Sequence, residues 1–356
     1  MDKSNKTRLS GEVNAILKKV SRTLYLSVSI LPEPVRSYMG LGYLLCRALD
    51  TAVDTQGVPA GDKLKILDLA RRLDKPEARA GLLAAAASIS PLTAEPGERE
   101  LLHKFPKILA VYDELPAGDR PLFADLVGGV AAGMEMDVAS FPGGAPAAFK
   151  TGRDLERYCG LIGGKPGVFW ARLYRNAIRS ASRGAGDFPH EKDAEMIGSA
   201  LQITNILKDM AADLRLGRCY LPQEDLATRN MRPEDLLNPA NMERLREITF
   251  KWTYWALDRL DQCEAFVTAI PKTELALRAA VIWPVYWAMD TLAETAQSNL
   301  LDPADRPRVG RGRIYGTIAA TPPLLLSNTA FARGYRFRRE TLIGSITRGN
   351  YEGRAI

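Results

Sequence analysis

The sequence predicts an all-α protein, a single helical bundle with a central active-site cavity. Over most of the chain, apolar residues recur at steps of three and four, which is the period of an amphipathic helix. Alternating β-branched runs and Asn-Gly hairpin turns are absent from the sequence. With 356 residues, of which 46% are hydrophobic, the chain has enough apolar material to bury a substantial core.

Prolines and loop-forming segments divide the first half of this helical pattern. Pro32 and Pro34 end one apolar run, and Pro91 ends another, because proline cannot continue a helix. The break at 141–146 is treated as a loop inside one domain, since acidic motifs lie on both sides of it. The helices expected before this break are 11–20, 24–31, 35–54, 62–73, 78–89, 98–114 and 121–140.

The second half is expected to contain the longer helices. Pro166 falls inside the helical run 154–178, with Gly163, Gly164 and Gly167 around it, so we expect a kink there. The run Gly-Gly-Lys-Pro-Gly does not match the phosphate loop Gly-x-x-x-x-Gly-Lys-Ser/Thr, and that interpretation is rejected. The remaining helices are expected at 201–216, 242–267, 273–298 and 311–319, with a polar connection at 222–239.

One row of polar side chains marks the helix that begins at Leu201. Gln202, Asn205, Asp209 and Asp213 follow one another at steps of three or four, so they share one helical face. Two carboxylates one turn apart repel each other unless water or a cation separates them. A solvated acidic face is the ordinary explanation of such a pair, but a second pair upstream favours a binding site.

That second pair, Asp50 and Asp54, closes a helix that is apolar on most sides. Such a helix is expected to be buried, and a carboxylate at its end needs a partner, because burying an unpaired charge is costly. Two carboxylate pairs on two helices predict one cavity in which Mg²⁺ joins carboxylates to substrate phosphates. We therefore expect a magnesium–diphosphate site with Asp50, Asp54, Asp209 and Asp213 as metal ligands.

Composition argues against several other functions. The formal charge of +6 favours anionic partners such as diphosphates or acidic lipid head groups, and no RNA-binding signature supports nucleic acid. The sequence contains only two histidines, which argues against a zinc cluster and against a Ser-His-Asp triad. The four cysteines form no Cys-x-x-Cys pair, which favours a reduced, cytoplasmic protein. We expect neither a signal peptide nor a membrane-spanning helix.

The chain is divided into a helical domain, 1–320, and a basic tail, 321–356. Three interpretations of this tail stay open. It is a peripheral contact with the inner face of a membrane, a packed terminus, or a disordered one.

The two acidic motifs, in their order along the chain, resemble those of the squalene/phytoene synthase family of head-to-head prenyl synthases. Arg47-Ala-Leu-Asp50-Thr-Ala-Val-Asp54 is similar to the family's first aspartate-rich motif. The row from Gln202 to Asp213, followed by Gly-Arg218-Cys-Tyr-Leu-Pro, is similar to its second. The resemblance implies the isoprenoid synthase type of helical bundle.

Two shorter motifs extend the resemblance to about residues 21–315. Ser21-Arg22 matches the family's N-terminal Ser-Arg, and Tyr158-Cys159 with the glycines that follow matches its Tyr-Cys…Gly motif. Arg47-Ala-Leu-Asp-Thr and the segment from Trp283 to Ala293 are closer to the squalene synthase branch.

This branch implies condensation of two farnesyl diphosphates through presqualene diphosphate, then reduction by NADPH to squalene, with Mg²⁺ as cofactor. It implies that Tyr158 transfers a proton and that the four aspartates are also catalytic residues. Substrate-binding residues would be Ser21, Arg22, Arg47, Gln202, Asn205 and Arg218, and NADPH-binding residues would be Arg308, Arg311 and Arg313. No Gly-x-Gly-x-x-Gly follows a predicted strand, so NADPH would bind the helical body itself. Five residues are candidates for either the cavity wall or the core: Val53, Phe169, Trp283, Tyr286 and Trp287.

The sequence also departs from the family pattern. Ala212 stands where relatives carry an acidic residue, and Lys208 stands where arginine is common. Two alternatives stay open. One is a phytoene or dehydrosqualene synthase, which shares the condensation and uses no reductant. The other is a non-catalytic helical subunit that keeps the fold.

Overall fold

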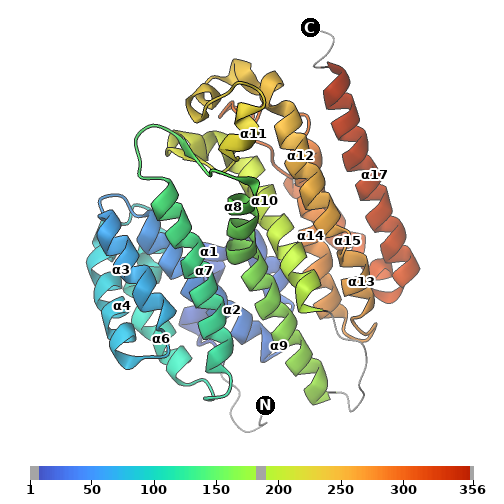
Figure 1. Ribbon diagram of the computed structural model, residues 1–356. Coiled ribbons are helices and arrows are strands. Elements are labelled where there is room, and N and C mark those ends of the chain that lie inside the picture. The colour runs from blue at the N-terminus through green and yellow to red at the C-terminus, as the bar shows by residue number, and fades with distance from the viewer. Residues whose placement is uncertain (1–7, 182–189, 353–356) are drawn as a thin grey trace. The chain divides into compact units, whose positions relative to one another are not determined.

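The computed structural model describes residues 8–181 and 190–352, leaving out the side chains of 22, 23, 177–181 and 349–352. Regular structure in these ranges is almost entirely helical, which confirms the predicted all-α class (Figure 1). The chain forms two compact units. Unit 1 is Met1–Val138 with Val168–Asp187, and unit 2 is Ala139–Gly167 with Phe188–Ile356.

Unit 1 is built from consecutive helices that begin near the N-terminus. Ser10 caps the first helix by accepting a hydrogen bond from the Val13 backbone N–H. This helix continues through the expected break after residue 20, because no proline or glycine interrupts it there. The Ser21 hydroxyl donates to the Leu17 carbonyl one turn earlier. The helices are α1 (Gly11–Ser29), α2 (Val35–Asp54), α3 (Ala60–Arg71), α4 (Pro76–Ile89), α5 (Pro96–His103), α6 (Phe105–Asp113) and α7 (Arg120–Ser140), with a 3₁₀ turn, η1 (Ser90–Leu92).

Unit 2 contains the longest helices. They are α8 (Gly152–Cys159), α10 (Glu191–Arg215), α11 (Gln223–Ala227), α12 (Met242–Leu260), α13 (Cys263–Thr268), α14 (Leu275–Thr295), α15 (Arg311–Ala319), α16 (Thr321–Leu326) and α17 (Asn328–Glu352). Short turns η3 (Pro233–Leu237) and η4 (Pro239–Asn241) precede α12. The helix α9 (Lys165–Ala181) starts in unit 2 and continues in unit 1.

The expected kink at Pro166 takes the form of a π-helical turn. This turn, η2 (Gly160–Gly164), joins α8 to α9 and packs against α10. Glycine is required at the contact, because a Cβ on Gly163 would lie 2.2 Å from the Gly198 carbonyl oxygen, and one on Gly167 would lie 2.1 Å from that of Ala194. The two backbones therefore approach more closely than side chains would allow.

Two short strands escaped the sequence analysis. β1 (Ala147–Ala148) pairs in parallel with β2 (Arg218–Cys219). Gly217, with a φ of +82°, ends α10 and turns the chain into β2. Each strand is only two residues long, so neither shows an alternating pattern that sequence analysis can detect.

The C-terminal helices pack on α14. α17, the last helix drawn in Figure 1, packs along α14. Its inner face is formed by the buried side chains Phe331, Tyr335, Leu342 and Ile346. The Arg278 side chain, which is fully buried on α14, donates to the backbone carbonyls of Val267 and Ile270 and to the Asn328 side chain. No helix among the residues the structure describes is both long and apolar enough to cross a membrane.

Candidate functional site

The polar row on α10 lies along the half-buried side of an otherwise buried helix. Its apolar residues, among them Ile203, Ile206 and Met210, are buried. Gln202, Asp209 and Asp213 are half-buried and Asn205 is exposed. The expected amphipathic helix is therefore confirmed, and it starts ten residues earlier than expected, at Glu191 rather than Leu201.

Asp209 is held by basic side chains. One carboxylate oxygen, Oδ1, accepts from Nε of Arg306 at 3.0 Å and from a second nitrogen of the same guanidinium. The other oxygen, Oδ2, lies 3.4 Å from Nζ of Lys208. The sequence analysis did not pair Arg306 with Asp209, because the two residues are 97 positions apart.

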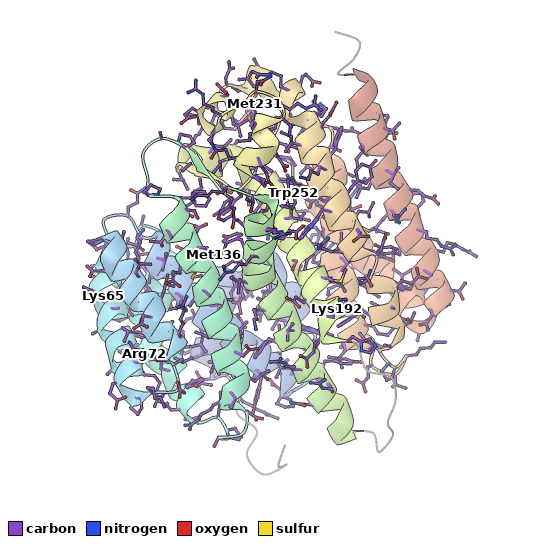
Figure 2. All side chains as sticks on the ribbon, viewed as in Figure 1. Lys65, Arg72, Met136, Lys192, Met231 and Trp252 are labelled. Carbon is purple, nitrogen blue, oxygen red and sulfur yellow. The ribbon has the colours of Figure 1, made fainter. Side chains whose placement is uncertain are left out.

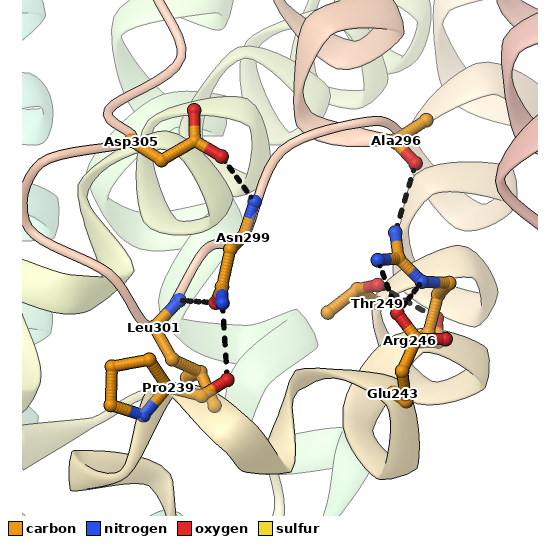
Figure 3. Close-up of polar contacts among 8 residues, drawn as sticks. All are labelled: Pro239, Glu243, Arg246, Thr249, Ala296, Asn299, Leu301 and Asp305. Atoms are coloured by element: carbon orange, nitrogen blue, oxygen red, sulfur yellow. Dashed lines mark hydrogen bonds and ion pairs between the residues drawn. The ribbon is translucent and has the colours of Figure 1, made fainter. Parts of the chain in front are cut away.

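The loop that carries Arg306 is anchored at its base, as Figure 3 shows. Asn299 donates from its side chain to the Pro239 carbonyl at 3.1 Å, and its backbone N–H donates to Asp305 at 2.7 Å. Arg246 on α12 donates to the Ala296 carbonyl at the end of α14 and is itself held by Glu243. These hydrogen bonds hold the chain in place just before Arg306. They therefore help to position the Arg306 side chain at Asp209.

The first acidic motif ends α2 in unit 1. This helix is buried on most sides, as expected, and Asp54 is exposed at its last residue. Arg47 forms ion pairs with Asp50 on the same helix and with Glu98 on α5. Burial acts to lower the pKa of Arg47, but the charges of Asp50 and Glu98 outweigh it and the net shift is upward. Glu98 was missed because it lies 51 positions from Arg47 in sequence.

Tyr158 lies in an aromatic cluster within unit 2. Its ring stacks on that of Tyr220 with centroids 5.1 Å apart, and their hydroxyl oxygens are 3.5 Å apart. Phe141 and Phe149 complete the cluster. The sequence analysis did not assign a role to Tyr220, and the short strand β2 brings it there.

The other expected substrate-binding residues have different surroundings. The Ser21 hydroxyl is buried and donates to Leu17 at 2.6 Å, a structural contact within α1. The side chain of Arg22 lies outside the described residues. Asn205 accepts from Lys208 at 3.2 Å, and Arg218 is half-buried on β2.

The basic segment expected to bind NADPH is exposed, but one member is engaged. Arg313 donates to Asp290 on α14 at 3.3 Å, and Arg338 of α17 lies 3.8 Å from the same oxygen. Burial raises the pKa of Asp290, and the two arginines offset only part of this effect. Arg308 and Arg311 are exposed and make no ion pair with a described residue.

All five candidate wall residues are buried. Tyr286 is fully buried, stacks on Phe331 of α17 and donates to its carbonyl, and Trp283 donates to Thr321 at 2.9 Å. These contacts with the C-terminal helices indicate a core role for Tyr286 and Trp283. Trp252, labelled in Figure 2, has a similar role on α12, where it donates to Asp225.

The donor chemistry of both aspartate pairs fits Mg²⁺. This ion prefers oxygen ligands and usually joins one or two carboxylates to waters and substrate phosphates. Among the described residues, no group of three or more His, Cys, Asp or Glu side chains is arranged to hold a metal ion. Each pair would therefore need further oxygens, from water or from a substrate diphosphate.

Comparison with known proteins identifies the chain's relatives. Residues 17–313 match the model of the squalene/phytoene synthase family. The 15-cis-phytoene synthase of Synechocystis sp. is 27% identical over 282 residues, which cover 77% of this chain and 71% of that protein. The phytoene synthase of Arthrospira platensis is 27% identical over 278 residues, covering 77% and 78%.

Solved structures share the helical fold. The squalene synthase TcSQS in complex with the ligand BPH1237 aligns with a TM-score of 0.73 at 19% identity, covering 96% of this chain and 98% of that one. A ligand-bound dehydrosqualene synthase aligns with a TM-score of 0.56 at 19% identity, covering 91% and 96%. The family match covers well over half of the sequence and includes both aspartate pairs, which lie on α2 and α10. The chain belongs to the squalene/phytoene synthase family of prenyl-transferring enzymes.

Proposed function

We propose that the protein condenses two identical prenyl diphosphates head to head and completes the reaction without a reductant, as a phytoene synthase does. The observation that carries this proposal is the set of sequence relatives, which are phytoene synthases matching most of the chain. Head-to-head condensation is the chemistry that the family shares. The reading that the sequence first favoured, a squalene synthase using NADPH, becomes the second candidate.

The proposal gives each acidic helix a defined task. Asp50 and Asp54 on α2, and Asp209 and Asp213 on α10, would hold Mg²⁺, which neutralises the diphosphate and makes it a better leaving group. Arg47 and Arg218 would bind phosphate oxygens, for which the guanidinium fork is well shaped. We propose that both aspartate pairs serve the same reaction.

The proposed chemistry places further demands on the chain. Loss of diphosphate leaves an allylic cation, which the double bond of the second substrate attacks to form a cyclopropyl intermediate. Water would quench such a cation, so apolar and aromatic side chains must surround it. The Tyr158–Tyr220 pair offers both π faces and hydroxyl groups, and we assign it to cation stabilisation or proton transfer.

Product analysis with and without NADPH tests the proposal. Purified protein is incubated with Mg²⁺ and with farnesyl or geranylgeranyl diphosphate, and the hydrocarbons are separated by chromatography. We expect a conjugated triene, formed equally well in both conditions, with phytoene as the product from the C20 substrate. Squalene formed only with NADPH would instead establish the second candidate.

The second candidate keeps specific support in the sequence. The segment from Trp283 to Ala293 and the basic residues 308–313 resemble those of squalene synthases. Engagement of Arg313 by Asp290 weakens this support, since an arginine already paired with a carboxylate is less available to a dinucleotide phosphate. A non-catalytic subunit is the remaining alternative, and release of diphosphate from either substrate would exclude it.

A further inference from the structure

One stretch accounts for the net positive charge of the chain. Residues 306–339 contain eight arginines and neither an aspartate nor a glutamate, the longest stretch of the chain that is free of acidic residues. Subtracting these eight from the 48 basic residues leaves 40 against 42 acidic ones, a balance of −2 for the rest of the chain. The net charge of +6 therefore comes entirely from this stretch, which spans α15, α16 and the first half of α17.

Half of these arginines are neutralised within unit 2. Arg306 pairs with Asp209, Arg313 and Arg338 contact Asp290, and Arg339 pairs with Asp261. The others are exposed and make no ion pair with a described residue: Arg308, Arg311, Arg333 and Arg336. These four form what we call the free arginine set.

Large apolar side chains accompany the free arginine set. Tyr315 on α15 is 63% exposed and Phe337 on α17 is 67% exposed. Tyr315 follows Arg311 by four residues, and Phe337 follows Arg333 by four, so on each helix an arginine and an aromatic ring share one face. Leu326 on α16, which is 61% exposed, adds a third apolar side chain.

The opposite face of α17 is already occupied. Phe331, Tyr335 and Leu342 are buried against the rest of unit 2, and Tyr335 donates to Asp261 at 2.9 Å. Arg333 and Phe337 therefore project away from the packed face of this helix, which runs along α14 (Figure 1). The outward face is presented on an ordered element.

We propose that α15, α16 and the first half of α17 form a docking surface for an anionic lipid bilayer. Arginines without acidic partners complement the negative charge of lipid head groups, while tyrosine, phenylalanine and leucine insert at the level of those head groups. The pairing of arginine and aromatic residues on both helices suits this interface, because each guanidinium can stay in water while the ring enters the lipid. The surface goes beyond the proposed function and does not depend on it.

Vesicle binding tests the proposal directly. The full chain is sedimented with vesicles of equal parts phosphatidylglycerol and phosphatidylcholine, and separately with pure phosphatidylcholine, at low and physiological salt. We expect binding to the anionic vesicles alone, weakened by salt. The variant Arg333→Gln/Arg336→Gln should bind roughly 30-fold more weakly, at about fivefold for each arginine near an anionic surface. Phe337→Ser should also weaken binding without removing charge.

A matched control separates this surface from net charge. Lys18→Gln/Lys272→Gln removes the same two charges at exposed positions outside residues 306–339. Leu92→Ser removes an exposed leucine, 57% accessible, in unit 1. We expect both controls to bind anionic vesicles like the original protein.

Three results would overturn the proposal. They are no binding to anionic vesicles at low salt, equal binding to neutral vesicles, and equal loss in the lysine control and the arginine variant. Because the measurement records binding rather than turnover, it is independent of whether the protein makes phytoene, squalene or neither. All substituted side chains are exposed, and circular dichroism of each variant confirms that the fold is retained.

Discussion

Arg306 gives the acidic row on α10 a partner that a metal ion would have to displace or share. Arg306→Gln removes its ion pair with Asp209. An exposed pair contributes about 0.2–1 kcal/mol, so the Mg²⁺ concentration for half-maximal turnover should fall by up to about fivefold. Metal titration of the reaction measures this, and Arg308→Gln, which removes an unpaired arginine nearby, is the control. A higher Mg²⁺ requirement in Arg306→Gln would show that Arg306 assists metal binding.

Tyr220 is expected to act with Tyr158. Tyr220→Phe keeps the stacked ring and removes one hydroxyl of the pair, and Tyr158→Phe removes the other. If the hydroxyls work together, each single variant should lower turnover about as much as the double variant, because residues that act as a unit are not additive. Turnover and thermal unfolding are measured for all three, with the exposed Tyr254→Phe as control. Independent, multiplicative losses would contradict this expectation.

At the scale of single residues, the sequence predicts candidate chemical groups but not the side chains that pair with them. Asp50, Asp54, Asp209 and Asp213 stand out because helical spacing is visible in sequence. Glu98 and Arg306 reach Arg47 and Asp209 only through folding, and their types alone do not distinguish them from other charged surface residues.

The contact of the π-turn with α10 depends on the absence of side chains. Gly163→Ala would place a methyl group against the backbone of Gly198, where no flexible group can move aside. We expect it to lower the free energy of unfolding by about 3 kcal/mol, at the upper end of the overpacking range. Denaturant unfolding measures the change.

Gly128 in α7 is the matched control for this substitution. It is a helical glycine with open space around its Cβ position, so Gly128→Ala should raise the free energy of unfolding by about 0.5–1 kcal/mol. If Gly163→Ala were as stable as the original protein, the turn η2 and helix α10 would be able to move apart without a loss of folding free energy, which would contradict this expectation.

At the scale of elements, the expected helices were confirmed more often than their limits. The range 311–319 agrees with α15. The expected helix 98–114 is instead two helices, because Pro106 at the start of α6 cannot donate the backbone hydrogen bond that would continue α5. The expected helix 242–267 is also two helices, separated at Asp261. The sequence has no proline or glycine there that would predict the break.

The two aspartate pairs lie in different compact units, so whether they act together is a question at the scale of the whole molecule. We propose that both pairs serve one reaction. We therefore expect Asp50→Asn, Asp209→Asn and the double variant to lose turnover by a similar factor of at least 10², because residues that act as a unit are not additive. Product formation from radiolabelled substrate measures the loss. Factors that multiply in the double variant would indicate two independent contributions.

The cysteines provide a second test of the whole fold. All four are free; Cys159, Cys219 and Cys263 are buried and Cys46 is half-buried. Burial raises the pKa of each thiol, to about 12 for Cys46 and about 12 for Cys219. The reactive thiolate is therefore scarce at pH 8, and we expect negligible labelling by a disulfide reagent until the protein unfolds. Absorbance of the released thiol measures this, and rapid labelling of the native protein would contradict the burial.

The packing of α17 has a consequence for anyone who shortens this chain. Composition alone suggests a cut after residue 320, at the start of the basic tail. Translation that stops there would leave the ring of Tyr286 without Phe331 and the guanidinium of Arg278 without Asn328. The apolar face of α14 that α17 covers would then be exposed to solvent. We expect the shortened protein to be found in inclusion bodies rather than in the soluble fraction of the lysate.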